Sequence, residues 1–337
     1  MPKVSIIIPL FNKEEYISTT LDTVLGQEFS DYEVIIVNDG STDSSLDIVN
    51  EYAKQDSRIK VYTIPNGGVS NARNVAMSYA AGDWIQFLDA DDVLNSQYLE
   101  KALKVAEDNN VDIIFSNFEK INSQGQVLER VTSSYTGRFD KIHLMDLFME
   151  LQPKNGFFGF ISNKLIRREL IEENNVKFPV GITLAEDLAF YIQLYQRLEW
   201  CYFIDENSFS YLQTDKNYLF NDNIDYRAQL SIQVSIRDWF ESKNYYEKYK
   251  NPLDKRISDY IYYVIFHDNE RGLGIKQAYH DIVDNPEIFR SLCGQESVGL
   301  QKRVLYLLKE RRYKSLTIVF KVRNLIRGFY RRMRRNG

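Results

Sequence analysis

The chain has 337 residues, of which 44% are hydrophobic and 26% are charged. These proportions are typical of a soluble globular protein, and the length allows a large core and two domains. No stretch approaches the roughly 20 consecutive apolar residues that a membrane-spanning helix needs. The composition therefore excludes an integral membrane protein, and any membrane contact is expected to be peripheral.

The two cysteines indicate a reducing compartment. Cys201 and Cys293 lack the spacing of a metal site or of a disulfide framework. The N-terminal apolar run is too short for a signal peptide and is expected to begin a strand. We therefore expect a cytoplasmic protein, with any membrane attachment at the inner face.

The formal charge of −5 is spread unevenly along the chain. Residues 309–337 contain eleven Lys or Arg and one acid, a charge of +10, so the preceding 308 residues carry −15. This asymmetry predicts a basic tail on an acidic body. The acidic body would repel a nucleic acid, so nucleic-acid binding is not expected.

The first 120 residues alternate between short apolar runs and segments with one apolar helical face. The apolar runs predict strands over residues 4–9, 33–38, 59–64, 83–88 and 111–118. The helical patterns cover residues 14–27, 70–80 and 96–108, and another helix carrying Leu46, Val49 and Ala53 follows capping residues 41–43. This order predicts an α/β fold with a mainly parallel sheet and helices on both faces. Ligands bind such sheets beyond the carboxyl ends of the strands. The unusual residues lie at those ends, at 9–12, 38–43, 65–68 and 89–92.

The later parts of the chain change character twice. The middle mixes short elements, with a strand expected over residues 163–167, a helix over 186–197 and a strand pair over 200–212. Beyond about residue 216 the pattern becomes helical and rich in aromatic residues. We therefore expect one domain over residues 1–215, divided near residue 120, and a helical region over 216–337.

An acidic cluster ends the fourth expected strand. The apolar run 84–88 stops at Asp89, Ala90, Asp91 and Asp92. Carboxylates this close repel one another, and a divalent cation would relieve the repulsion. Asp89 and Asp91 offer hard oxygen ligands suited to Mg²⁺ or Mn²⁺. The alternative is a solvated acidic turn in which Asp92 caps the next helix.

Two other strand ends carry residues suited to a nucleotide. Asp39 can accept a hydrogen bond from an imide N–H such as that of uracil, although an Asx turn or helix cap is the alternative. Gly67 and Gly68 would let the backbone approach a ligand closely, and a helix N-terminus behind them favours anions. Arg73 lies one turn into that helix, where it faces either a nucleotide or solvent.

Glu186 and Asp187 open the helix expected over residues 186–197. Acidic residues are electrostatically favoured at a helix N-terminus whatever their function. In the functional interpretation, one of the two is a general base that deprotonates a hydroxyl nucleophile. Neighbouring helical residues point in different directions, so the two carboxylates are expected to have different roles.

Taken together in this order, these segments resemble the family 2 glycosyltransferases of the GT-A fold. The resemblance covers roughly residues 2–200 and rests on five segments that are each common alone. They read VSIIIPLFN at 4–12, VNDGSTD at 37–43, NGGVSNARN at 66–74, FLDADD at 87–92 and AED at 185–187. The resemblance implies an inverting, metal-dependent, non-processive enzyme that transfers a sugar from a nucleotide diphosphate, usually UDP. The implied acceptor is a hydroxyl of a cell-surface glycan or of a lipid-linked or protein-linked glycan. Residues 1–120 would be the nucleotide-binding half and 121–215 the acceptor half.

Carried over residue by residue, the resemblance implies a set of donor-binding positions. Asp39 would bind the uracil ring, Arg73 would hold the nucleotide, and the strand end at 9–12 would line the base pocket. The implied positions are Pro9, Phe11, Asn12, Asp39, Asn66, Gly67, Arg73, Asp89, Ala90 and Asp91.

The resemblance also implies the metal ligands and the catalytic base. Asp91 would ligate Mn²⁺ or Mg²⁺ directly, and Asp89 would lie near the ribose and the metal. Asp187 would take the proton of the acceptor hydroxyl, and Glu186 would shape the metal and acceptor site. A single displacement of this kind inverts the anomeric carbon without a covalent carboxylate nucleophile.

The chain departs from the family pattern in two places. Many relatives have a further basic residue or His after the Glu-Asp helix, near the diphosphate, and Lys216 is the candidate for that role here. Residues 196–200 have the wrong spacing for the motif of processive synthases, so polymer extrusion is not expected. His143, His267 and His280 lie outside the motifs and are expected to be ordinary surface or core residues.

The basic tail predicts a helix with one narrow apolar stripe. The stripe consists of Val319, Val322, Ile326, Phe329 and Met333, and Lys and Arg residues occupy the other faces. Such a helix is typical of an element that lies on an anionic membrane surface, which would suit a lipid-linked acceptor. The alternative is packing on the protein itself or on another subunit of a homo-oligomer.

Two other functions stay open from the sequence. A sugar-nucleotide pyrophosphorylase would need a Gly-rich basic loop after the first strand, where this chain has Pro9-Leu10-Phe11-Asn12. A non-catalytic sugar-nucleotide or glycan-binding protein would keep the fold, but retention of Asp39, Asp91 and Asp187 argues against it. Residues 153–162 are expected to contribute to the choice of donor sugar.

Overall fold

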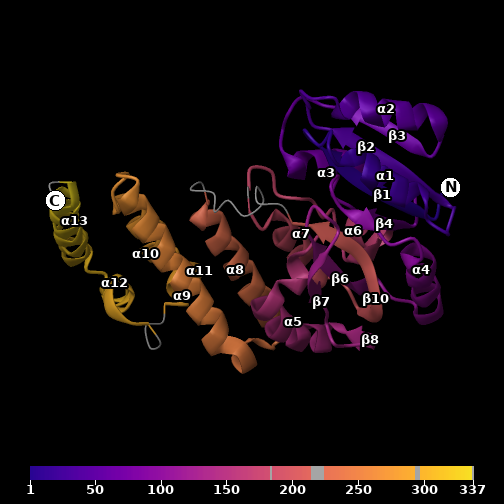
Figure 1. Ribbon diagram of the computed structural model, residues 1–337. Coiled ribbons are helices and arrows are strands. Elements are labelled where there is room, and N and C mark those ends of the chain that lie inside the picture. The colour runs from indigo at the N-terminus through magenta and orange to yellow at the C-terminus, as the bar shows by residue number, and fades with distance from the viewer. Residues whose placement is uncertain (183, 214–223, 293–296, 336–337) are drawn as a thin grey trace. The chain divides into compact units, whose positions relative to one another are not determined.

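The computed structural model describes residues 1–182, 184–213, 224–292 and 297–335, with side chains up to residue 327. Its contacts divide into two compact units, Met1–Asn223 and Ile224–Gly337 (Figure 1). The first unit contains the sheet, and the second is built from helices. The domain boundary expected between residues 215 and 216 lies outside the described residues.

Four parallel strands form the first part of the sheet, in the order β3-β2-β1-β4. They are β1 (Val4–Leu10), β2 (Tyr32–Asn38), β3 (Ile59–Thr63) and β4 (Trp84–Phe87). Every residue of β1, β2 and β4 is buried, as continuous apolar runs require when helices cover both faces of a sheet. The strand order reverses at β1, which creates a crevice at the carboxyl ends of the strands.

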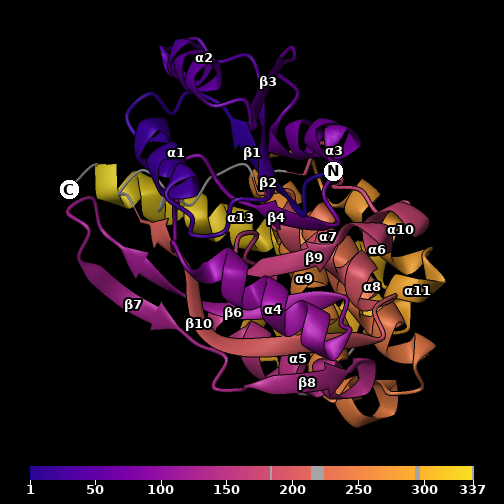
Figure 2. The same cartoon turned by 90° about the vertical axis from the view of Figure 1, so that its right-hand side faces the viewer.

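Three helices connect these strands: α1 (Ile17–Leu25), α2 (Ser45–Gln55) and α3 (Val69–Tyr79). Figure 2 shows α1 and α2 on one side of the parallel strands and α3 on the other. The change of side follows from right-handed connections, since β4 lies on the opposite flank of β1 from β2. The apolar face expected for the first helix is confirmed, because Ile17, Leu21 and Val24 are fully buried.

The rest of the sheet is mixed. Strand β9 (Lys164–Arg167) runs antiparallel to β4 and to β6 (Ile113–Ile121), whereas β6 is parallel to β10 (Trp200–Leu212). The antiparallel additions at its edges are β5 (Val93–Leu94), β7 (Val127–Val131) and β8 (Gly137–Asp140). Over the described residues, four strand pairs are parallel and five are antiparallel. The expected parallel arrangement therefore holds for the first four strands and for the pair β6 and β10, whereas the remaining strand pairs are antiparallel.

Strand β10 corrects the expectation of a strand pair over residues 200–212. It is one strand of 13 residues whose register with β6 shifts between Ile204 and Asn207 and again between Asn207 and Ser210. Asp205 and Glu206 lie within the first of these irregularities. A bulge admits extra polar residues without ending a strand, which is why the polar interruption does not mark a turn.

The helices in the second half of this unit position the remaining site residues. They are α4 (Tyr98–Asn109), α5 (Lys141–Asn155), α6 (Arg168–Glu173) and α7 (Glu186–Tyr195), with a short 3₁₀ helix η1 (Phe157–Gly159). Two buried tyrosines anchor α7. The Tyr191 hydroxyl donates to the carbonyl of Ile161 at 2.7 Å, and the Tyr195 hydroxyl donates to the carbonyl of Phe158 at 2.9 Å. These bonds fix the helix whose first turn carries Glu186 and Asp187.

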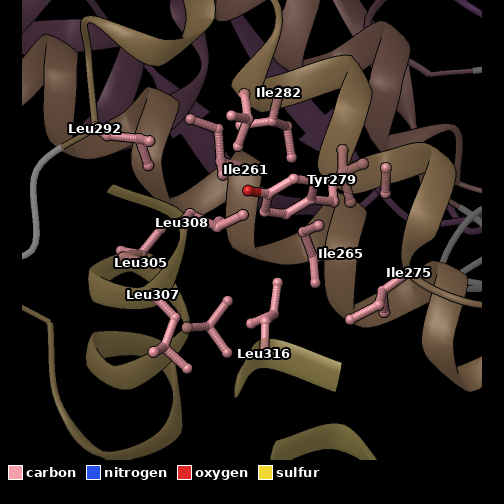
Figure 3. Packing of buried hydrophobic residues seen from close by; sticks show 14 of the residues in the cluster. Ile261, Ile265, Ile275, Tyr279, Ile282, Leu292, Leu305, Leu307, Leu308 and Leu316 are labelled. Atoms are coloured by element: carbon pink, nitrogen blue, oxygen red, sulfur yellow. The ribbon is translucent and has the colours of Figure 1, made fainter. Parts of the chain in front are cut away.

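The second unit confirms the expected helical C-terminal region. Its helices are α8 (Tyr226–Ser242), α9 (Tyr246–Glu270), α10 (Lys276–Val283), α11 (Pro286–Phe289), α12 (Gly299–Lys309) and α13 (Tyr313–Arg335). Figure 3 shows Ile261 and Ile265 of α9 facing Tyr279, Leu308 and Leu316 from the later helices, and all of these side chains are buried. Among the described residues, no helix has both the length and the apolar character needed to cross a bilayer.

Candidate active site

A cavity of about 470 Å³ opens at the carboxyl ends of β1, β2 and β4, beside α3 and the first turn of α7. Ten of the twelve site residues expected from the sequence line it, and the exceptions are Asn12 and Gly67. The ten are Pro9, Phe11, Asp39, Asn66, Arg73, Asp89, Ala90, Asp91, Glu186 and Asp187. The position is the one at which open α/β sheets bind ligands, because loops from neighbouring strands diverge there.

The loop after β1 is tied to the loop after β2. Asn12 has a left-handed backbone with φ of 50°, its N–H donates to Ser41 Oγ at 3.1 Å, and its Oδ1 accepts from the Thr42 N–H at 2.8 Å. The expectation that Asn12 lines the base pocket is therefore not met, because its side chain is used to join the two loops. Phe11 does line the cavity, and it is 45% exposed.

Asp39 joins the second strand end to the glycine turn after β3. Its two carboxylate oxygens accept from the N–H groups of Gly67 and Gly68 at 2.7 and 2.8 Å, and its carbonyl accepts from Asn66 Nδ2 at 2.9 Å. Gly68 has φ of 86°, a conformation that favours glycine. A carboxylate oxygen can accept more than one hydrogen bond. Asp39 thus holds the turn and still offers acceptor capacity to the cavity that it lines.

Arg73 of α3 is the centre of an ion-pair network drawn from three parts of the chain. Its Nη1 donates to Asp187 Oδ1 at 2.6 Å, and its Nη2 donates to Asp89 Oδ1 at 2.7 Å. Glu186 Oε1 lies 3.9 Å from Nη1, and the ring of Phe178 lies 5.3 Å from the guanidinium. The Arg73 side chain is only 3% exposed. Burial alone would lower its pKa, but the surrounding carboxylates raise the pKa above the ordinary value, so the guanidinium stays charged.

Asp187 has the electrostatics of a general base. Ala185, two residues before it, has a left-handed φ of 61°, an uncommon conformation for a residue other than glycine. Burial raises the pKa of Asp187 to about 7; the charges of Glu186 and Asp89 add to this shift, and Arg73 and Lys164 oppose it. A base whose pKa lies near neutrality is both available in its charged form and strong enough to accept a proton.

Asp89 and Asp91 follow β4, and each pairs with a different basic side chain. Asp89 pairs with Arg73, and Asp91 accepts from Lys13 Nζ. Burial raises the pKa of Asp91, which Lys13 partly offsets. No three His, Cys, Asp or Glu side chains in the described part of the chain gather closely enough to enclose a metal by themselves. Two carboxylates do suit Mg²⁺ or Mn²⁺ when phosphate oxygens and water complete the coordination. The residues present therefore fit a cation that binds together with a diphosphate.

Asp92 is not the solvated helix cap that the sequence left open. It is 1% exposed, and its carboxylate accepts from the Leu212 N–H at 3.3 Å and from Ser162 Oγ at 3.4 Å. Burial raises its pKa well above the ordinary value. Asp92 thus ties the acidic strand end to β10, and the N-cap of α4 is Gln97 instead.

A second cavity of about 370 Å³ shares Asp89, Glu186, Asp187 and Tyr211 with the first. Gly156, Gly159 and the segment 160–162 line its other side, which places part of the 153–162 segment beside the candidate base. Asp187 therefore lies where two compartments meet. One has the nucleotide-type residues, and the other has room for a further group.

Two polar side chains that line the first cavity were not predicted from the sequence, those of Lys13 and Tyr211. Lys13 follows directly after the strand end at 9–12, so extending that segment by one residue would find it. Tyr211 gives no local signal, because it reaches the cavities only through the pairing of β10 with β6.

The histidines lie outside both cavities, as expected. His143 and His280 are exposed and pair with Asp140 and Asp284 at 2.9 Å, and His267 packs against the ring of Tyr226. The basic residue considered for the diphosphate, Lys216, lies outside the described residues.

Comparisons with known proteins identify the family and the fold of the chain. The family model described as Glycosyl transferase family 2 matches residues 5–174. The chain is 34% identical over 211 residues to "Uncharacterized glycosyltransferase EpsJ" of Bacillus subtilis, which covers 63% of this chain and 61% of that protein. It is 35% identical over 199 residues to the poly(ribitol-phosphate) beta-glucosyltransferase of Bacillus spizizenii, which covers 57% of this chain and 29% of that protein. The matches thus span less than two thirds of either relative.

The fold resembles that of a solved structure, S. aureus TarS residues 1–349 in complex with UDP-GlcNAc. The TM-score is 0.67 at 19% sequence identity, with 96% of this chain and 92% of that chain covered. At this identity the likeness establishes the GT-A fold with its helical C-terminal region. The family match argues against the pyrophosphorylase alternative. The chain belongs to glycosyl transferase family 2.

Proposed function

We propose that the protein transfers a sugar, with inversion, from a UDP-sugar to a hydroxyl group of a glycan acceptor. The observation that carries the proposal is the position of Asp187. Its carboxylate has a pKa raised to about 7 and lies on the wall that two cavities share. A base in this place can receive a proton from a hydroxyl that enters from one cavity while the donor occupies the other.

The first cavity suits a uridine nucleotide. Asp39 offers carboxylate acceptors for the uracil imide N–H, and Phe11 offers an exposed aromatic face for the base. Asn66 and the N-terminus of α3 lie on the same wall, where backbone N–H groups favour phosphate. The TarS structure was solved with UDP-GlcNAc, which supports a UDP-sugar as the donor class.

Asp89 and Asp91 would hold Mn²⁺ or Mg²⁺ at the diphosphate. The bound cation would neutralise the charge that develops on the leaving nucleoside diphosphate. Arg73 holds Asp89 in place by a hydrogen bond. The guanidinium of Arg73 is itself held by Asp187. The metal ligand and the base are thus oriented by one guanidinium.

Asp187 would act on the acceptor. Its carboxylate takes the hydroxyl proton as the oxygen forms a bond to the anomeric carbon, and the bond to the diphosphate oxygen breaks on the opposite face. One displacement inverts the centre, and the electron pair of the broken bond leaves with the diphosphate. Glu186 raises the pKa of Asp187 by its negative charge and lines both cavities.

The acceptor that we propose is a cell-surface polysaccharide or its lipid-linked precursor. The similarity to a poly(ribitol-phosphate) beta-glucosyltransferase supports a polymer rich in hydroxyl groups. The second cavity, next to Asp187, has Gln152 and Tyr211 among its walls, and both can hydrogen-bond to hydroxyls.

The test is UDP release from a panel of UDP-sugars with Mn²⁺ present, with GDP-sugars as the control for the base. The proposal expects release from at least one UDP-sugar, strongly stimulated by acceptor, and none from the GDP-sugars. Asp187→Asn should lose turnover and still bind UDP. Full turnover by Asp187→Asn would refute the role of the base.

We also propose that α12 and α13 hold the protein at an anionic membrane surface on the cytoplasmic side. A groove of about 730 Å³ lies between the two helices, with Ile318, Val322 and Ile326 on its wall. These three side chains are 49 to 60% exposed. Arg303, Arg323 and Arg327 also line the groove, so cationic groups border an apolar surface. Apolar contact beside Arg matches the acyl and headgroup layers of anionic lipid.

The structure changes the stripe expected from the sequence. Val319 packs partly against the core, and Leu316 and Phe320 are buried in it. Val322 and Ile326 stay exposed, whereas the side chains of Phe329 and Met333 lie outside those described. Arg323 and Arg327 pair with Glu270, so their charge is partly balanced. Deleting the tail would remove Leu316 and Phe320 and damage the core, so point substitutions test the surface better.

The variants are Val322→Asp and Ile326→Asp, with Leu273→Asp as the control, since Leu273 is 71% exposed and lies outside the groove. Sedimentation with phosphatidylglycerol vesicles should carry down the wild type and the control but neither groove variant. Equal binding by all four proteins would contradict the proposal. Loss of a dimer in the groove variants, without any vesicle binding by the wild type, would assign the groove to a second copy of the chain instead.

A further inference from the structure

Lys13 is held over the candidate metal site by a loop that cannot easily move. Its backbone N–H donates to Ser45 Oγ at 2.7 Å, and Ser45 is fully buried at the start of α2. On either side, Asn12 bonds to Thr42 and the Glu14 N–H donates to Asp43 Oδ2 at 3.1 Å. The backbone of Lys13 is therefore fixed by the loop after β2, and its side chain reaches across the cavity to Asp91.

The two cations at the acidic strand end differ in their freedom. Arg73 is 3% exposed and faces Asp89, Asp187 and Glu186 together, so withdrawing it would take away the guanidinium that the three carboxylates share. Lys13 is 32% exposed, and Asp91 is the carboxylate that it contacts. Its ammonium sits on a flexible four-carbon stem. Of these two cations, Lys13 is the one that can leave.

We propose that Lys13 is a donor-binding residue that occupies Asp91 in the empty enzyme and moves to the donor diphosphate when a divalent cation takes its place. The inference rests on the proposed function, since it needs a diphosphate donor and a cation at Asp89 and Asp91. The position of Lys13 on the wall of the same cavity places its ammonium within the space that the diphosphate would fill.

Electrostatic repulsion supplies the reason for the move. A divalent cation at Asp91 and the ammonium of Lys13 cannot share one carboxylate without strong repulsion. The diphosphate brings several negative charges, which give Lys13 a new partner. Metal and nucleotide are then coupled: each should bind more tightly when the other is present, and the coupling must be equal in both directions.

Calorimetry on the full-length protein tests this with four titrations. Mn²⁺ is titrated with and without UDP, and UDP with and without Mn²⁺, for the wild type, Lys13→Met and Lys13→Arg. Met keeps the aliphatic stem and the backbone hydrogen bond, so folding is expected to survive. Lys54→Met is the matched control, because Lys54 lies on α2, is 69% exposed and does not line the cavity.

Lys13→Met should bind Mn²⁺ about tenfold more tightly than wild type when UDP is absent, and UDP about tenfold more weakly when Mn²⁺ is absent. Its coupling between the two ligands should shrink accordingly, while Lys54→Met should match the wild type. Lys13→Arg keeps the charge and should keep a coupling closer to that of the wild type.

The outcomes distinguish a failure of the role of Lys13 from a failure of the proposed function. A wild type that binds UDP and Mn²⁺, together with a Lys13→Met variant of unchanged affinities, would overturn the role of Lys13 alone. A wild type that binds neither ligand would overturn the proposed function and this inference with it. A higher Mn²⁺ affinity in Lys13→Met with unchanged UDP affinity would refute the transfer of the ammonium to the phosphate.

Discussion

Arg73 and Asp187 lie 114 residues apart in the chain, and Nη1 of the one donates to Oδ1 of the other at 2.6 Å. The same guanidinium donates to Asp89 at 2.7 Å. A buried, permanently charged side chain thus fixes the distance between the candidate base and the candidate metal site. Because Arg73 lowers the pKa of Asp187 while burial raises it, the pair also sets the pH at which the base can work.

The pH dependence of turnover follows from Asp187. Its pKa of about 7 means that it is protonated, and unable to accept the acceptor proton, in mildly acidic solution. We predict that kcat/KM for the donor falls about tenfold per pH unit below pH 7 and levels off above it. The measurement is the initial rate of UDP release across pH at constant free Mn²⁺. A flat profile between pH 5 and 8 would contradict this role.

The raised pKa of Asp187 should also make the free energy of unfolding depend on pH. Stability should fall over the pH range in which activity rises. The folded state raises the pKa of Asp187 from its ordinary value of 3.8 to about 7, so the folded chain holds a proton that the unfolded chain releases. The contribution of Asp187 to the free energy of unfolding is therefore present below about pH 4 and is lost as the pH rises towards 7. Urea unfolding at several pH values should show a smaller fall over this window in Asp187→Asn than in the wild type. Identical falls in the two proteins would exclude the raised pKa.

Substituting Arg73 should affect stability and the base together. Arg73→Met removes the guanidinium that the carboxylates of Asp89, Glu186 and Asp187 share, and breaking a buried ion pair in this way costs about 3–5 kcal/mol. The residual activity should require higher pH, because the guanidinium that lowers the pKa of Asp187 is gone. Denaturant unfolding and the pH profile measure the two effects. Arg58→Met is the control, since Arg58 forms a half-buried pair with Asp56 and lines neither cavity.

Asp39 should be needed for the shape of the nucleotide pocket. Asp39→Asn replaces one of two acceptor oxygens with an NH₂ group that would face the N–H of Gly67 or Gly68. Leaving one buried donor unpaired costs about 1–3 kcal/mol, so the melting temperature should fall and UDP affinity should drop. Asp47→Asn, an exposed change on α2, should leave both unchanged. A variant with wild-type stability would show that the two backbone bonds are dispensable.

Those features of the site that lie within one short segment could be predicted from the sequence. Strand ends carry their polar residues in a contiguous segment, so the positions of Asp39, Asn66, Asp89 and Asp91 follow from the apolar runs that precede them. The pairing of Arg73 with Asp187 could not be predicted, because it depends on how α3 and α7 meet at the sheet. The same holds for Lys13, whose role depends on the loop around Ser45.

The sheet shows a similar division. The parallel order of β1 to β4 follows from alternating strand and helix patterns, since each crossover needs a helix. Strand β9 enters the middle of the sheet antiparallel to β4 and β6, and no pattern within residues 164–167 indicates that direction. The continuity of the bulged strand β10 could not be predicted either, because it comes from pairing with β6 and not from the composition of the strand.

Metal dependence should reside in the acidic strand end. Chelation with EDTA should abolish UDP release, and Mn²⁺ or Mg²⁺ should restore it. Asp91→Ala should lose turnover at any tested metal concentration, because the remaining carboxylate of Asp89 is held by Arg73. Asp83→Ala, at the opposite end of β4, is the control and should retain its metal response. Full activity in EDTA would place this enzyme among transferases that need no cation.

The central claim is that Asp187 is the base of a UDP-sugar transferase, and one comparison tests it most directly. UDP release by the wild type and by Asp187→Asn is measured with Mn²⁺ and acceptor, alongside calorimetric binding of UDP to both proteins. We expect the two proteins to bind UDP equally, and we expect Asp187→Asn to lose turnover by about 10²–10⁴-fold. Equal turnover by the two proteins would contradict it.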